Sequence, residues 1–176
     1  MSQFWKCAPV FFMIAFQCFI VLHYYDVDLF KLTTQQKYVG FLLNDGRLGN
    51  QLFHMITGYG IARTLNRTHY LPFNGWIEHV RKYLIRLEKV FPRLKQTYIF
   101  ATNETKERVV PFAGSCCSYY DPLRLKNHTD QFLLLNFRFG HNPRYFEDYI
   151  GDIREILNFS EELRENASDL LLSLKK

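Results

Sequence analysis

Cysteine is scarce in this chain of 176 residues and occurs only at positions 7, 18, 116 and 117. Four cysteines, two of them adjacent, do not make the framework of a small disulfide-stapled domain. They also lack the C-x-x-C spacing of a structural zinc site. Adjacent cysteines seldom bridge each other without strain. We therefore expect Cys116 and Cys117 either to pair with something outside this chain or to stay reduced and buried.

Internal repeats and low-complexity tracts are also absent, and hydrophobic residues make up 48% of the chain, as in ordinary folded domains. The net charge is +5, from 22 Lys and Arg against 17 Asp and Glu. A basic balance can suit nucleic acid, but here the cations are not interleaved with aromatic residues as in RNA-reading modules. We therefore expect no nucleic-acid partner.

Residues 8–25 carry no formal charge when His23 is neutral, and most of them are apolar. Its length is just sufficient to cross a bilayer core. Lys6 precedes it and Asp26 follows it, so the positive-inside tendency keeps the N-terminus in the cytosol. This pattern predicts a cytosolic tail (1–7), a transmembrane signal anchor (8–25) in contact with lipid, a stem (26–37) and a lumenal domain (38–176).

A cleaved signal peptide and a buried core helix remain alternatives for residues 8–25. The run ends in His-Tyr-Tyr-Asp, whereas cleavage sites usually carry small residues. The acceptor pattern N-x-[ST] for N-glycosylation supports export, because it occurs five times and always after the apolar run. The predicted glycosylation sites are Asn66, Asn103, Asn127, Asn158 and Asn166.

Residues 38–73 have the pattern of a strand, a turn, a helix and a second strand. Val39–Leu43 is an apolar run of strand length, and turn residues follow it. The helical pattern begins at Asn50, and residues 69–71 form the second strand. Gly46 and Gly49 between them can simply turn the chain. Alternatively, free N–H groups at the start of the helix bind an anion, as in other open α/β sheets.

Strand and helix patterns alternate along the rest of the chain, which predicts the α/β class. We expect strands at 98–100, 108–112 and 132–137, an irregular segment at 114–127, and helices at 75–95, at 143–157 and after residue 159. Ser160 is the expected N-cap of the last helix. His54 falls on the buried face of the first helix, where a hydrogen-bonded core histidine is the expectation.

The stretch GRLGNQLF (46–53) resembles the G-x-L-G-N-Q-[ML] signature of the α-1,2-fucosyltransferases, glycosyltransferase family 11. A second stretch, LLLNFRFGHNPRYFEDYIGDIREILNFSEEL (133–163), is similar to the family's strand, aromatic-rich loop and Y-F-x-D helix start. Both motifs occur in the family's order. The resemblance spans residues 38–163 and is weak in the middle.

This resemblance implies a Rossmann-like first lobe of a two-lobed nucleotide-sugar glycosyltransferase, held in the Golgi membrane as a type II protein. It implies GDP-fucose as the donor, a galactose-terminated glycan as the acceptor, inversion at the sugar carbon, and neither a metal nor another cofactor. The implied substrate-binding residues are Gly46, Arg47, Gly49, Asn50, Gln51, Arg138 and His141. No catalytic base is identified, and homo- or hetero-oligomers are both compatible with the pattern.

The chain departs from the family because it lacks the donor motif H-x-R-R-G-D. No Arg-Arg pair occurs in these 176 residues. We therefore expect a truncated or partial member, inactive if the motif is indispensable. Protein O-fucosyltransferases share a G-R-x-G-N-Q loop and are an alternative, although Tyr145-Phe146-x-Asp148 favours the galactoside enzymes. A non-catalytic, membrane-anchored glycan binder or partner protein is the alternative from another class.

Overall fold

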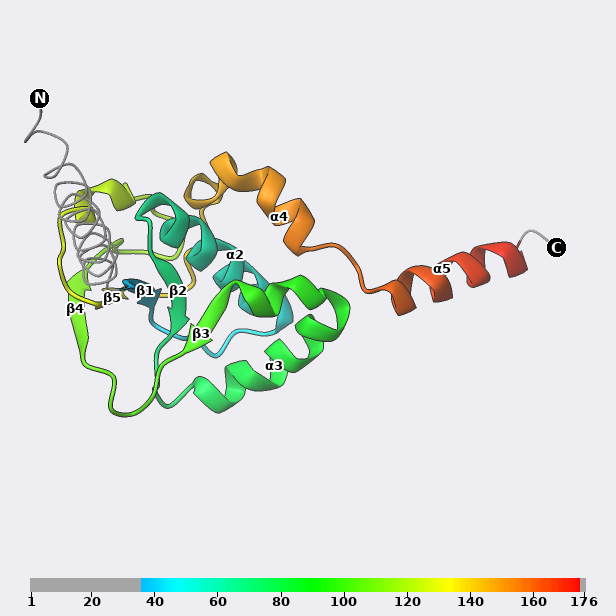
Figure 1. The fold of residues 1–176 in the computed structure, drawn as a ribbon, viewed down its shortest axis with the longest axis horizontal. Coiled ribbons are helices and arrows are strands. Elements are labelled where there is room, and N and C mark those ends of the chain that lie inside the picture. The colour runs from blue at the N-terminus through cyan, green and yellow to red at the C-terminus, as the bar shows by residue number, and fades with distance from the viewer. Residues whose placement is uncertain (1–35, 175–176) are drawn as a thin grey trace, which may run out of the picture. The chain divides into compact units, whose positions relative to one another are not determined.

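The computed structural model describes residues 36–174, which contain a five-stranded sheet with helices packed against it and a last helix (161–174) that extends away from it without a buried residue (Figure 1). All four pairs of neighbouring strands are parallel, so the expected α/β class and Rossmann-like arrangement are confirmed. The strands are β1 (Tyr38–Phe41), β2 (Thr68–Leu71), β3 (Tyr98–Phe100), β4 (Glu107–Pro111) and β5 (Phe132–Asn136). The α-helices are α2 (Leu48–Thr64), α3 (Ile77–Val90), α4 (Ile150–Ile156) and α5 (Glu161–Leu174).

The strand order is β3-β2-β1-β5-β4, which puts β1 in the middle of the sheet. Val39 of β1 is in register with His69 of β2 on one side and with Leu133 of β5 on the other. The predicted strand–helix–strand unit is therefore confirmed as β1, α2 and β2. A strand from the far end of the chain becomes the second neighbour of β1.

The core lies on the face of the sheet from which Val39, Phe41, Leu133 and Leu135 project. Helix α2 covers these side chains with an apolar stripe that includes Ile61. Helix α3 packs beside it, over Leu43 and the strands β2 and β3. Burying one such Leu or Ile side chain contributes about 2 kcal/mol, so this face holds α2 against the sheet.

Two predicted helices are shorter than expected. Residues 75–95 divide into α3 and a 3-10 turn, η2 (Pro92–Gln96), because Pro92 has no N–H to continue the α-helical ladder. Residues 143–157 divide into two single turns, η4 (Pro143–Tyr145) and η5 (Glu147–Tyr149), followed by α4. The irregular segment contains one short turn, η3 (Pro122–Leu125). The last helix begins one residue after Ser160, as predicted.

The predicted tail (1–7), the membrane anchor (8–25) and most of the stem (26–37) lie outside the described residues. Within residues 36–174, no helix has both the length and the apolar character that a bilayer span requires. The five asparagines of the glycosylation motifs are all exposed, which carbohydrate attachment requires. Their occupancy stays a prediction.

Two buried histidines lie between α2 and the sheet. The ring of His54 stacks on Phe41 with centroids 3.8 Å apart, and the ring of His69 lies 5.9 Å from that of His54. Both residues are almost fully inaccessible, so the buried position predicted for His54 is confirmed. The hydrogen bond that we expected for His54 is not found. Neither ring nitrogen of His54 or of His69 has a hydrogen-bond partner among the described residues.

Candidate functional site

The carboxyl ends of the parallel strands form the edge of the sheet at which open α/β folds bind their ligands. Strand β1 leads into the turn before α2, and its neighbour β5 leads into the aromatic-rich loop. The strand order therefore brings the two stretches that resemble the fucosyltransferase motifs to one edge of the sheet. They lie far apart in the chain, and the β1–β5 pairing brings them together.

The turn after β1 is held from inside by Gln51. The residue is buried, and its amide nitrogen donates to the Gly46 carbonyl at 2.7 Å and to the carbonyl and side-chain oxygens of Asn44 at 3.2 Å. The side-chain oxygen of Asn44 in turn accepts from the Gly46 N–H at 2.8 Å. A ring nitrogen of His79 on α3 contacts the same Gly46 carbonyl at 3.1 Å. Gln51 thus positions the loop from beneath it.

Helix α2 begins two residues earlier than the pattern predicts. Its N-cap is Arg47, and the first α-helical bond runs from the Gln51 N–H to the Arg47 carbonyl at 3.0 Å. The N–H groups of Leu48, Gly49 and Asn50 therefore precede the hydrogen-bonded ladder. Arg47 makes no capping bond through its side chain, and the first turn contains no acidic residue. This exposed helix start has the free donors and the positive dipole end that attract an anion.

The two glycines of the turn have different surroundings. A Cβ atom at Gly46 would lie 2.4 Å from the Cβ of Asn50 and 2.6 Å from the Asn44 side-chain oxygen. A Cβ atom at Gly49 would meet no atom within 4 Å. The space above Gly49 is therefore open to a ligand, whereas Gly46 is required for the turn to close.

We expect Gly46→Ala and Gly49→Ala to change stability in opposite directions. Gly46→Ala forces the side chains of Asn44 and Asn50 away from the new methyl group and should lower the free energy of unfolding by about 1–3 kcal/mol. Gly49→Ala removes backbone freedom from a helical position and should raise it by about 0.5–1 kcal/mol. Urea titration of both variants measures the difference. Equal effects of the two substitutions would contradict this account of the turn.

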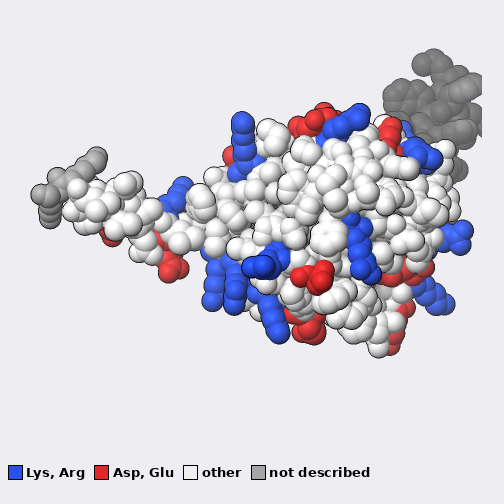
Figure 2. Space-filling model, turned by 180° about the vertical axis from the view of Figure 1, so that it is seen from behind, with Lys and Arg blue, Asp and Glu red and all other residues white. Residues whose placement is uncertain are grey.

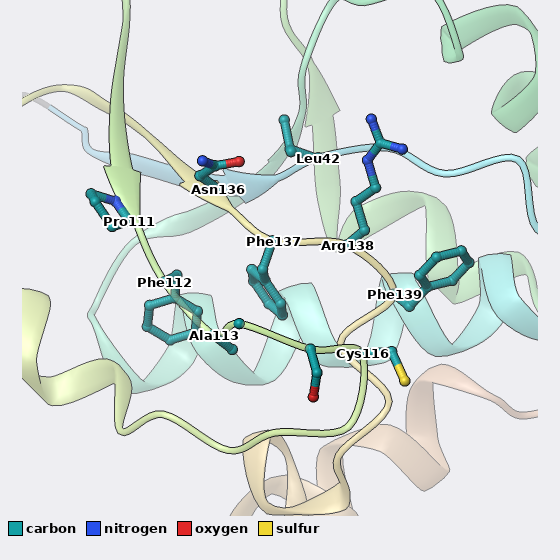
Figure 3. Close-up of a pocket in the computed structure, with 11 residues that line it drawn as sticks. Leu42, Pro111, Phe112, Ala113, Cys116, Asn136, Phe137, Arg138 and Phe139 are labelled. Atoms are coloured by element: carbon teal, nitrogen blue, oxygen red, sulfur yellow. The ribbon is translucent and has the colours of Figure 1, made fainter.

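A cavity of about 480 Å³ opens at the ends of β1, β5 and β4 (Figure 3). This volume lies within the range of small-molecule sites. Its lining includes Leu42 after β1, Asn136 and Arg138 at the end of β5, and residues 111–116 after β4. Figure 3 shows the Arg138 side chain leaving the backbone on the side opposite to Phe137. Phe137 is buried beneath the cavity, and Arg138 is exposed in it.

The loop after β5 has an uncommon backbone at two residues. Phe139 has a φ of 69° and Gly140 a φ of 58°, in the left-handed region. The Thr57 hydroxyl of α2 donates to the Gly140 carbonyl at 2.8 Å and fixes this bend from the core side. Left-handed Phe is unfavourable, so the anchoring by Thr57 holds a conformation that the loop would not keep alone.

His141 is not among the residues that line the cavity. Its ring lies 4.9 Å from that of Phe53 on α2, edge to face, and its Nε2 atom is buried without a hydrogen-bond partner among the described residues. Burial lowers the pKa of His141 below its usual value, so the imidazole is neutral at pH 7. The structure thus gives His141 a place in the wall behind the loop, next to the helix that carries Asn50.

Among the seven predicted substrate-binding residues, only Arg138 lines the cavity. Gly46, Arg47, Gly49 and Asn50 form the neighbouring helix start, Gln51 is buried beneath it, and His141 is behind the loop. Sequence reasoning missed Asn44, the buried anchor of the turn, and Asn136, Ser115 and Cys116 in the cavity lining. Asn136 could have been recognised as the first polar residue after the apolar run of β5. Their roles toward a substrate stay predictions.

Charged side chains of both signs share the surface. Figure 2 shows Lys and Arg side chains distributed over one face with Asp and Glu between them, not as one continuous basic surface. In residues 36–174, no group of three or more His, Cys, Asp or Glu side chains is placed to hold a metal ion. Arg47 and Arg138 are exposed cations near the carboxyl edge of the sheet.

Curated relatives of the chain occur in Caenorhabditis elegans. The chain is 29% identical over 140 residues to svh-11, provisionally named a galactoside 2-alpha-L-fucosyltransferase, with 76% of this chain and 37% of that protein covered. It is 29% identical over 146 residues to a galactoside 2-alpha-L-fucosyltransferase, with 77% and 34% covered. A further protein of that name is 31% identical over 111 residues, with 62% and 31% covered. The chain is thus similar to proteins named galactoside 2-alpha-L-fucosyltransferase over about three quarters of its own length.

The resemblance predicted from the two motifs is thereby confirmed. The chain spans about a third of the length of the curated relatives it matches. No family model matches it, and no solved structure gives a significant match.

Proposed function

We propose that this chain takes part in the transfer of fucose from GDP-fucose to a hydroxyl group of a galactose-terminated glycan. The carboxyl edge of its sheet holds the diphosphate of the donor at the start of α2 and a sugar in the adjoining cavity. The two stretches that resemble the fucosyltransferase motifs meet at this edge, and the curated relatives carry the name of the same reaction.

The observation that carries this proposal is the helix start at Arg47. Three backbone N–H groups without helical partners lie next to the residue that carries a guanidinium group. The first turn contains no acidic residue. As the sugar carbon separates from GDP, negative charge grows on the diphosphate, and fixed donors stabilise that charge. The open space above Gly49 lets a phosphate approach the backbone closely.

The cavity next to this helix start offers the other half of the site. Arg138 brings a second guanidinium group, while Asn136 and Ser115 bring neutral hydrogen-bonding groups suited to sugar hydroxyls. Leu42 and Phe112 bring apolar surface to the same cavity. The lining includes no carboxylate or imidazole, so none of its side chains is a strong general base for the acceptor hydroxyl.

The test uses the full-length chain purified in detergent. Calorimetry with GDP measures binding at the helix start, and incubation with GDP-fucose and a galactoside measures transfer through the fucosylated product. We expect GDP to bind, and GMP, which lacks the second phosphate, to bind more weakly by about tenfold or more.

The two measurements separate the candidate functions. Product together with GDP binding supports the enzyme, and a fucosylated protein acceptor in place of the galactoside points to the O-fucosyltransferase reaction. GDP binding without product supports a non-catalytic partner protein, consistent with the missing Arg-Arg pair. If GDP and GMP bind equally or not at all, the helix start is no diphosphate site.

A further inference from the structure

We propose that Cys116 and Cys117 are a reversible redox site in the wall of the cavity. A low-molecular-weight disulfide of the glutathione type oxidises the two adjacent thiols to a ring disulfide, and closing the ring loosens the loop that carries Arg138. Of our two alternatives for these cysteines, the structure corrects the buried one, because both thiols are free and exposed. Cys116 itself lines the cavity (Figure 3).

The sulfur atoms are already close. The Sγ atoms of Cys116 and Cys117 lie 2.8 Å apart, within reach of the bond length of about 2.05 Å that a disulfide requires. Either sulfur can be the donor in their hydrogen bond, and this bond raises the pKa of the Cys117 thiol. The loop therefore presents both sulfurs to solvent in one orientation and needs little side-chain rearrangement for the bond to form.

A ring between adjacent residues is easily reopened. Adjacent Cα atoms are about 3.8 Å apart, whereas disulfide-linked Cα atoms usually lie about 4.4–6.8 Å apart. The closed ring is therefore strained, and strained, exposed disulfides belong to the readily reduced, regulatory kind. This distinguishes the pair from a structural disulfide, which would have to resist the glutathione pool.

Oxidised glutathione accepts the two electrons that the two protein thiols lose when the ring forms. One cysteine thiolate attacks a sulfur of oxidised glutathione and releases one glutathione thiol, leaving a mixed disulfide. The neighbouring cysteine then attacks the protein sulfur of that mixed disulfide and releases the second glutathione. The two protein thiols lose two protons and two electrons in all, and one glutathione disulfide becomes two glutathione thiols.

Both carbonyl groups of the cysteine pair are tied to the loop after β5. The His141 N–H donates to the Cys116 carbonyl at 2.7 Å, and the Asn142 side-chain amide donates to the Cys117 carbonyl at 2.7 Å. Ring closure must rotate the peptide between the two cysteines, and this moves the Cys116 carbonyl, which belongs to that peptide, away from the His141 N–H. The loop keeps the bond from the Thr57 hydroxyl to the Gly140 carbonyl and the bond from the Asn142 amide to the Cys117 carbonyl, but it loses its backbone bond to Cys116.

The consequence reaches the predicted ligand side chain. Arg138 lies three residues before His141, and the Gly140 N–H donates to its carbonyl at 2.9 Å. Loosening residues 138–142 therefore releases Arg138 from its position in the cavity. We expect the oxidised form to bind a nucleotide more weakly, and this expectation rests on the proposed function. The thiol chemistry and the change in the loop do not depend on it.

The experiment equilibrates the full-length chain in mixtures of reduced and oxidised glutathione and then blocks free thiols with N-ethylmaleimide. In reducing mixtures, mass spectrometry should find two maleimides on the peptide with Cys116 and Cys117. In oxidising mixtures, the peptide should carry none and be lighter by two hydrogen atoms than the dithiol form. Hydrogen exchange at the His141 amide should become faster by about tenfold, the factor that one lost hydrogen bond explains.

Matched variants separate the possible outcomes. Cys117→Ser and Cys116→Ser should each take up one glutathione and show no change in exchange at His141. The double variant Cys7→Ser/Cys18→Ser should behave as wild type. A link from Cys116 or Cys117 to Cys7, to Cys18 or to a second chain would overturn the ring, as would a mixed disulfide that persists in the wild type. A ring without faster exchange would overturn the coupling to the loop.

Measuring the GDP affinity of the reduced and of the oxidised chain tests the redox inference and the proposed function separately. Reduced chain that binds no GDP speaks against the proposed function and leaves the ring untouched. Reduced chain that binds GDP, together with oxidised chain of the same affinity, contradicts the coupling from the cysteines to Arg138.

Discussion

The Arg47→Lys variant is expected to bind GDP about a hundredfold more weakly than wild type, and to transfer fucose correspondingly more slowly, with an unchanged melting temperature. A guanidinium group offers a planar fork to two phosphate oxygens, whereas an ammonium group offers one compact charge. A charge-assisted hydrogen bond is worth about 1.5–3 kcal/mol, and about 1.4 kcal/mol is a factor of ten in affinity. Folding should not change, because Arg47 is exposed and makes no capping bond.

The matched control is Arg154→Lys, an equally conservative change at an exposed position on α4. It should leave both GDP affinity and melting temperature at wild-type values. Calorimetry and thermal unfolding of the three proteins decide the matter. If Arg47→Lys binds GDP as wild type does, the turn before α2 is only a turn, and the Gly46–Gln51 site has to be abandoned.

Acidification from pH 7 to pH 5 is expected to remove about 4 kcal/mol of folding stability through His54 and His69 alone. Burial lowers the pKa of His69 to about 3, and burial together with the neighbouring histidines lowers the pKa of His54 well below its usual value. In the unfolded chain both titrate near 6.5. Their neutral forms are therefore compatible with the fold above pH 6.5. Each group costs about 1.4 kcal/mol per pH unit below that value.

The double variant His54→Phe/His69→Phe keeps aromatic rings against Phe41 and removes both titrating groups. Its free energy of unfolding in urea should fall by about 4 kcal/mol less than that of wild type between pH 7 and pH 5. His128→Gln, at a partly exposed histidine beside Asp130, should retain the wild-type dependence. Parallel pH curves for wild type and the double variant would show that the buried pair does not control acid stability.

Local chemistry made much of the fold predictable from the sequence. The apolar runs at β1, β2 and β5 and the turn residues after β1 predicted the strands and the strand–helix–strand unit, because these signals depend on near neighbours in the chain. The helix boundaries were less accurate. Helix α2 starts at Leu48 because the buried Gln51 closes the turn, and α3 ends at Val90 ahead of Pro92.

By itself, the sequence determined the α/β class, the glycine turn with its exposed arginine, and the resemblance to fucosyltransferases. Only the tertiary structure decided that β5 pairs with β1, and thus that Arg138 and the start of α2 share one edge of the sheet. It also turned Gln51 and His141 inward and placed Cys116 in the cavity wall. These placements depend on contacts between residues tens of positions apart. No periodicity or short motif encodes such contacts, because they form when the whole core packs.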